Sequence, residues 1–101
     1  MKNEIVLEGI LINDIKLIKN KAIGRLVSNH FYKTKSGEKK ERSIFIDLDF
    51  WNDNAEIANN DLKKGQRISL TGKLSLDEWE DKFKEKKSRY YIKVINFEIL
   101  I

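Results

Sequence analysis

The chain has 101 residues, 41% hydrophobic and 36% charged, and this length and balance predict one folded domain over residues 1–101 rather than a disordered chain. It contains no cysteine, which excludes disulfides and thiolate metal sites, and no apolar stretch near the roughly 20 residues that a membrane-spanning helix needs. With a net charge of +4 and no signal-peptide pattern at its start, the sequence predicts a weakly basic, cytoplasmic protein without a membrane partner.

Alternating apolar and polar residues predict strands in the first third of the chain. Residues 4–12 form the first predicted strand, in which Gly9 marks a bulge or a bend, and residues 15–18 extend that strand after a turn. A second turn, at residues 19–21, leads into a second predicted strand over residues 22–32.

The stretch SIFIDLDFW, residues 43–51, predicts a third strand with two unlike faces. The basic sequence before it, KTKSGEKKER at residues 33–42, is predicted to be a loop with Ser36 and Gly37 at its tip. One face of the strand is wholly apolar and is expected to close a core: Ile44, Ile46, Leu48 and Phe50. The other face combines rings with carboxylates and is expected to be exposed: Phe45, Asp47, Asp49 and Trp51.

The rest of the chain predicts one helix and two strands. Apolar residues at helical spacing predict the helix over residues 52–64, and Gly65 follows where a left-handed C-terminal cap belongs. Residues 66–76 and 90–100 predict the fourth and fifth strands. The charged sequence DEWEDKFKEKKS, residues 77–88, is predicted to connect these two strands as a long loop.

The order of these elements is typical of a small closed barrel, because many short strands and a single helix share about 100 residues. The sequence therefore predicts an all-β fold: a five-stranded Greek-key barrel of the oligonucleotide/oligosaccharide-binding (OB) class, with one short helix between strands three and four. Five basic residues in 33–42 and five in 82–89 fall in predicted loops. They suit a phosphate backbone, and they equally suit solvated loop tips.

Four stretches carry a resemblance to one family, the bacterial single-stranded DNA-binding proteins. NEIVLEGIL is similar to the family's opening strand, SGEKKE to its loop between strands two and three, and EWEDK to the tryptophan-bearing start of its loop between strands four and five. The most specific stretch is FIDLDFWNDNAEIANNDLKKGQRISLTGKL, where an aromatic strand leads into a helix and Lys-Lys-Gly precedes a strand ending in Gly-x-Leu. The resemblance covers nearly the whole chain.

The resemblance implies sequence-independent binding of single-stranded DNA in replication, recombination or repair, with no cofactor. Bases would stack on Phe45, Trp51 and Trp79, and on Phe31 or Tyr32, of which Phe31 is preferred. Stacking serves such a function because every base has a π face, and it contributes about 1–3 kcal/mol per base. Phosphates would be held by basic side chains: Arg25, Lys33, Lys35, Lys39, Arg42, Lys73 and Arg89.

The resemblance also implies a homo-oligomer, a tetramer or a dimer that is joined near the N-terminal strand. Two features depart from the family pattern. Asp47 and Asp49 share the predicted exposed face with Phe45 and Trp51, where carboxylates would repel phosphates. The chain ends at NFEILI, whereas the family continues to an acidic tip that recruits repair proteins. A short form of this kind, if complete, is expected to lack tail-mediated recruitment.

Other interpretations stay open at this point. The aspartates favour an OB-fold interaction module, a replication or primosome accessory that binds nucleic acid weakly, and stacking alone does not distinguish DNA from RNA. Local packing is an alternative role for Trp79, and covering the barrel end is one for Trp51. No catalytic arrangement or glycine-rich phosphate loop predicts an enzyme, and the carboxylates of Asp47, Asp49 and Asp53 do not predict a metal site.

Overall fold

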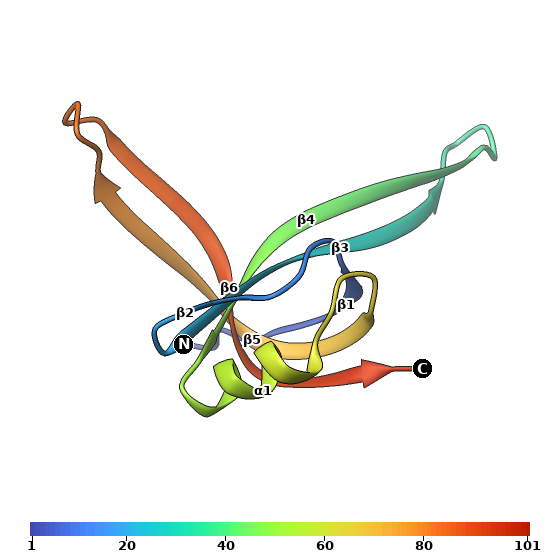
Figure 1. Ribbon diagram of the computed structural model, residues 1–101. Coiled ribbons are helices and arrows are strands. Elements are labelled where there is room, and N and C mark those ends of the chain that lie inside the picture. The colour runs from blue at the N-terminus through green and yellow to red at the C-terminus, as the bar shows by residue number, and fades with distance from the viewer.

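The computed structural model describes residues 1–101 and contains six strands and one helix (Figure 1). The elements are β1 (Ile5–Leu11), β2 (Lys16–Ile18), β3 (Lys21–Lys33), β4 (Lys39–Trp51), α1 (Asp53–Asp61), β5 (Arg67–Glu80) and β6 (Lys86–Leu100). Five strands close a barrel in the order β1-β5-β6-β4-β3, because β1 pairs with β5 along its length and with β3 at Ile10 and Leu11. This confirms the predicted OB-type barrel, with its helix between the third and fourth barrel strands.

Apolar side chains from every barrel strand fill the interior. The helix α1 covers part of the barrel by burying Ala55 and Ala58 against it. The alternation in β4 is confirmed at Leu48 and Phe50, which are fully buried, whereas Ile44 is exposed because β4 has left the barrel at that point. The largest core residues are Leu11, Leu26, Leu48, Phe50, Ile68, Leu70, Ile92 and Val94.

Two long hairpins project from the barrel as arms and diverge from each other (Figure 1). We call residues 27–45 the β3–β4 arm and residues 75–90 the β5–β6 arm. The loops predicted at 33–42 and 77–88 are wrong in extent, because the ladders continue to the pairs Lys33–Lys39 and Glu80–Lys86. Sequence patterning missed these strands because the arms are largely exposed, so no apolar alternation marks them.

The first predicted strand is also divided differently. Residues 15–18 do not extend it: Lys16–Ile18 forms β2, which turns back through Lys19 and Asn20 to pair with β3. A Cβ atom on Gly9 would overlap the carbonyl oxygen of Val27, so glycine is needed where β1 approaches β3.

The helix is shorter than the predicted span of 52–64, since Leu62 is already extended. Side chains satisfy the backbone beyond it: the Lys63 N–H donates to Gln66 Oε1 and the Lys64 N–H donates to Asp14 Oδ1. Gly65 has the expected left-handed conformation, with φ of 91°. No helix in the structure is long and apolar enough to cross a membrane.

Candidate nucleic-acid interface

One outward side of the sheet runs from the β3–β4 arm across the barrel to the β5–β6 arm. Strand pairing fixes this, because residues directly opposite each other share a face. Arg25 is opposite Asp47, Asp47 is opposite Tyr91 in the parallel pairing of β4 with β6, and Arg89 is opposite Asp77 on β5. We call this side the outer face, and its residues include Lys21, Arg25, Phe31, Lys39, Phe45, Asp47, Asp49, Trp51, Lys73, Asp77, Trp79, Lys87, Arg89 and Tyr91.

The structure brings three of the predicted aromatic residues together on the outer face, each about half exposed. Phe31 and Phe45 lie on the β3–β4 arm, and Trp79 lies on the β5–β6 arm opposite Lys87. Trp79 was predicted in a loop but lies in strand β5, so hydrogen-bonded pairing with β6 fixes the backbone that carries its exposed ring. A ring this exposed does not support the alternative of local packing for Trp79.

Phe31 and Tyr32 point to opposite sides of β3, as neighbouring residues in a strand do. Tyr32 shares the far side with His30, at 6.4 Å between ring centroids, and with Arg42, whose guanidinium lies 5.5 Å from the Tyr32 ring. Tyr32 and Arg42 are thus separated from the other predicted contacts, which favours Phe31.

Trp51 is less open than the other predicted aromatics. Its ring is partly buried, and the Lys21 Nζ lies 5.2 Å from the ring centroid. Its Nε1 is buried without a hydrogen-bond partner. Trp51 therefore offers less ring surface to a base than Phe31, Phe45 and Trp79 do.

Six of the seven predicted phosphate-binding residues, all except Arg42, lie on the outer face or at the tip of the β3–β4 arm. Lys33, Lys39 and Lys73 are exposed on the outer face, and the Lys39 Nζ lies 5.5 Å from the centroid of the Phe31 ring. Lys35 is exposed in the turn at the tip of the β3–β4 arm. Arg25 covers Phe45, with 5.9 Å from its guanidinium carbon to the ring centroid. Cations therefore stand beside Phe31 and Phe45, the two rings that this arm presents on the outer face.

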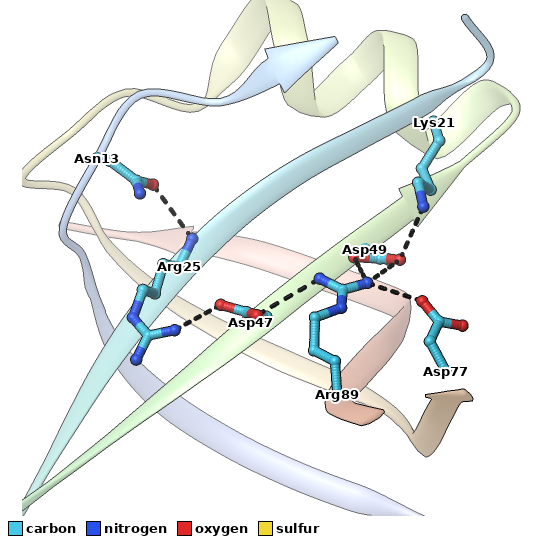
Figure 2. A network of polar contacts seen from close by, with 7 residues as sticks. All are labelled: Asn13, Lys21, Arg25, Asp47, Asp49, Asp77 and Arg89. Atoms are coloured by element: carbon cyan, nitrogen blue, oxygen red, sulfur yellow. Dashed lines mark hydrogen bonds and ion pairs between the residues drawn. The ribbon is translucent and has the colours of Figure 1, made fainter. Parts of the chain in front are cut away.

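The prediction that Asp47 and Asp49 are freely exposed is wrong. Asp49 is fully buried, and it forms ion pairs with Lys21 at 3.5 Å and with Arg89 at 3.1 Å (Figure 2). Asp47 lies 2.6 Å from Arg25 and 3.4 Å from Arg89. Both carboxylates are buried enough to require cationic partners, and strands β3 and β6 supply them.

Arg89 is at the centre of these contacts, because its guanidinium also lies 3.2 Å from Asp77 of β5. Burial acts to lower the pKa of Arg89, but hydrogen bonds to Asp77 and Asp49 and the charges of Asp49 and Asp47 outweigh it, so the pKa is raised. Arg89 was predicted to hold phosphate, but the structure shows its guanidinium bound to three carboxylates.

We call these six residues the ion-pair cluster: Lys21, Arg25, Asp47, Asp49, Asp77 and Arg89. Three carboxylates face three cations, so the cluster has no formal net charge. The expected repulsion of phosphates by Asp47 and Asp49 is therefore largely cancelled within the protein.

Sequence reasoning missed the roles of Lys21, Asp77 and Tyr91. Tyr91 is buried beneath Arg89, whose guanidinium carbon lies 4.7 Å from the ring centroid. The opposition of Arg25 to Asp47 follows from the β3–β4 register and was accessible in principle. The Asp47 and Asp49 partners of Arg89 could not be predicted, because they depend on the parallel contact of β4 with β6.

The chain matches the model of the single-strand binding protein family over residues 2–100. It is 33% identical over 105 aligned positions to the single-stranded DNA-binding protein of Helicobacter hepaticus, covering 99% of this chain and 62% of that protein. It is 30% identical to the single-stranded DNA-binding protein of Wolinella succinogenes, again covering 99% of this chain and 65% of the relative. The chain thus spans somewhat less than two thirds of the length of these curated relatives.

Solved structures show the same fold. The chain is similar to the Plasmodium falciparum SSB in complex with ssDNA, with a TM-score of 0.86, 21% identity, and coverage of 100% of this chain and 97% of the other. It is also similar to a deletion mutant of the single-stranded DNA-binding protein of Thermus aquaticus, with a TM-score of 0.78, 24% identity, and coverage of 99% and 51%.

Proposed function

The chain belongs to the single-strand binding protein family, and from this we propose that residues 1–101 form one domain that binds single-stranded DNA without sequence preference. The relatives are named single-stranded DNA-binding proteins, and one structural neighbour is a complex with ssDNA. The proposed role is binding rather than catalysis, in DNA replication, recombination or repair, in the cytoplasm and in association with the nucleoid.

The observation that carries this proposal is the composition of the outer face. Phe31, Phe45 and Trp79 expose rings on two arms, and exposed lysines stand beside them. Bases stack on the rings whatever their identity, and cations hold the phosphates between them. Because the aspartates between the arms are paired within the ion-pair cluster, the path between the aromatic residues is not a negative barrier.

The same finding weakens the alternative of a protein-interaction module. That alternative rested on carboxylates exposed beside aromatic residues, and Asp49 is fully buried. RNA binding is retained as an outcome of the test, since stacking is common to both nucleic acids.

The test is a titration with oligo-dT, followed by tryptophan fluorescence. The Trp51→Phe variant leaves Trp79 as the one tryptophan, and oligo-dT is expected to quench it. The slope of log K against log[salt] is expected to be about −0.7 per phosphate contacted. Absence of quenching at low salt would contradict the proposal, and competition with oligo-U decides between DNA and RNA.

We also propose that the protein assembles as a homo-oligomer, a dimer or a tetramer, through the free edge of β1. Residues 5–7 pair with β5 on one side only, and Val6 is strongly exposed there. An unpaired apolar edge readily pairs with a strand of a second protomer. An oligomer then presents several DNA-binding sites to one DNA chain, which raises the overall avidity. The Val6→Lys variant is expected to have a lower mass in solution than the unchanged protein. Equal masses would argue against this edge.

A further inference from the structure

The ion-pair cluster lies where the two arms separate. β4 pairs with β6 only over Asp47–Asp49 and Tyr91–Lys93, and beyond these residues the hairpins diverge (Figure 1). Arg89 comes two residues before Tyr91, at the first outer-face position past the last paired residue. Its guanidinium bridges the place where the arms separate, because it contacts Asp47 and Asp49 of β4 and Asp77 of β5 (Figure 2).

The cluster also connects the predicted stacking residues of the two arms. Phe45 is covered by Arg25, which pairs with Asp47, and Asp47 pairs with Arg89. From Arg89 the contacts continue to Asp77, which precedes Trp79 by two residues on the same face of β5. A series of ion pairs therefore runs from Arg25, beside Phe45 on the β3–β4 arm, to Asp77 at the base of the β5–β6 arm.

We propose that Arg89 is a positioning residue that fixes the orientation of the β3–β4 arm relative to the β5–β6 arm, and thereby sets the separation of Phe45 from Trp79. The planar guanidinium donates in several fixed directions, so it holds carboxylates from two strands at a defined geometry. Holding the arms before DNA arrives lowers the cost of ordering them on binding. The consequence for DNA rests on the proposed function, whereas the effect on the arms does not.

The Asp77→Asn variant separates this proposal from simple electrostatics. Removing a negative charge from the outer face should strengthen DNA binding if the carboxylate acts only by repulsion. If Asp77 holds the Arg89 guanidinium in position against Asp47 and Asp49, the substitution loosens the arms and DNA binding weakens instead. Glu78→Gln is the matched control, because Glu78 is exposed, lies on the other side of β5 and undergoes the same change in charge.

A distance measurement without DNA tests the arms directly. The chain has no cysteine, so Glu38→Cys and Glu85→Cys, one in the turn of each arm, provide two sites for nitroxide labels. Dipolar spectroscopy on labelled protein, diluted with an excess of unlabelled protein, then reports the separation of the arms within one protomer. We expect a broader distance distribution with Asp77→Asn and with Arg89→Lys. The lysine keeps the positive charge but lacks the planar guanidinium with its several fixed donors. Glu78→Gln should leave the distribution unchanged.

Binding to oligo-dT of increasing length completes the test. Asp77→Asn is expected to bind oligomers that reach both arms roughly threefold to fivefold more weakly, and shorter oligomers equally well, because only the long ones benefit from arms held in place. Unchanged distances with Asp77→Asn and Arg89→Lys would overturn the proposal, as would Asp77→Asn binding long oligomers as tightly as Glu78→Gln. If the unchanged protein binds no oligo-dT, the proposed function fails, and the distances alone decide the role of Arg89.

Discussion

Asp49 and Arg89 join strands β4 and β6 on the outer face of the barrel, with 3.1 Å between the Asp49 Oδ2 and a guanidinium nitrogen. The carboxylate is fully buried on β4, and the cation comes from β6 across the parallel contact of the sheet. A buried carboxylate is tolerated in this position because Arg89 and Lys21 both compensate it. Stability and the arrangement of the arms therefore depend on the same pair.

The first prediction concerns Asp49 itself. Asp49→Ala leaves Lys21 and Arg89 without a shared partner, and it should lower the free energy of unfolding by about 3 kcal/mol. Both cations are partly exposed, so the low end of the usual range is expected. Urea unfolding measures the change. Asp61→Ala, at an exposed position at the end of α1, is the control and should change stability by less than about 0.5 kcal/mol. Equal effects of the two substitutions would contradict the role of the ion pairs.

The second prediction concerns Trp79. Its ring is exposed on the outer face, so Trp79→Ala should weaken binding to oligo-dT by about tenfold while leaving thermal stability nearly unchanged. The change is measured by the fluorescence anisotropy of a labelled oligonucleotide. Phe83→Ala removes an even more exposed ring from the turn of the same arm and should have little effect. A similar loss in both variants would mean that the arm needs aromatic surface in general.

The third prediction compares two neighbouring residues on β3. Phe31 lies on the outer face and Tyr32 on the far side, so Phe31→Ala is expected to weaken oligo-dT binding about tenfold and Tyr32→Ala less than about twofold. The pair is its own control, since each variant loses one aromatic ring from the same arm. The reverse order would place DNA on the opposite side of the β3–β4 arm.

The fourth prediction uses salt to find phosphate contacts. Lys39→Gln should make the slope of log K against log[salt] less steep by about 0.7, the contribution of one phosphate to single-strand binding. Lys16→Gln, at an exposed position on β2, should leave the slope unchanged. Titrations at four or more salt concentrations are sufficient. An unchanged slope for Lys39→Gln would show that this lysine does not contact phosphate in the complex.

The barrel was predictable from the sequence because its core follows strand periodicity. Leu48 and Phe50 are buried as their alternation in residues 43–51 requires. The same pattern fails at Ile44, because the strand continues into an arm where neither side is covered. Periodicity shows which residues share an apolar face. Whether that face is buried depends on how far along the strand the barrel extends.

The ion-pair cluster was not predictable in the same way. Asp49 and Arg89 are 40 residues apart, and their contact depends on the register of two parallel strands. Local sequence showed only two carboxylates beside two aromatic residues, which suggested exposure. Of the two cations that pair with Asp49, Lys21 comes from β3, the hairpin partner of β4, but Arg89 comes from β6, which no local pattern connects to β4.

Under the proposed function, the neutrality of the ion-pair cluster also bears on how DNA would arrive at the protein. Long-range attraction comes from uncompensated charge, which on the outer face belongs to lysines of the β3–β4 arm such as Lys33 and Lys39. The first encounter is therefore expected at the arms, with a rate that falls as ionic strength rises. The aromatic residues would act only after capture, at short range, and would govern how long the strand stays bound. On this proposal, charge on the arms sets the speed of association and the rings set the residence time.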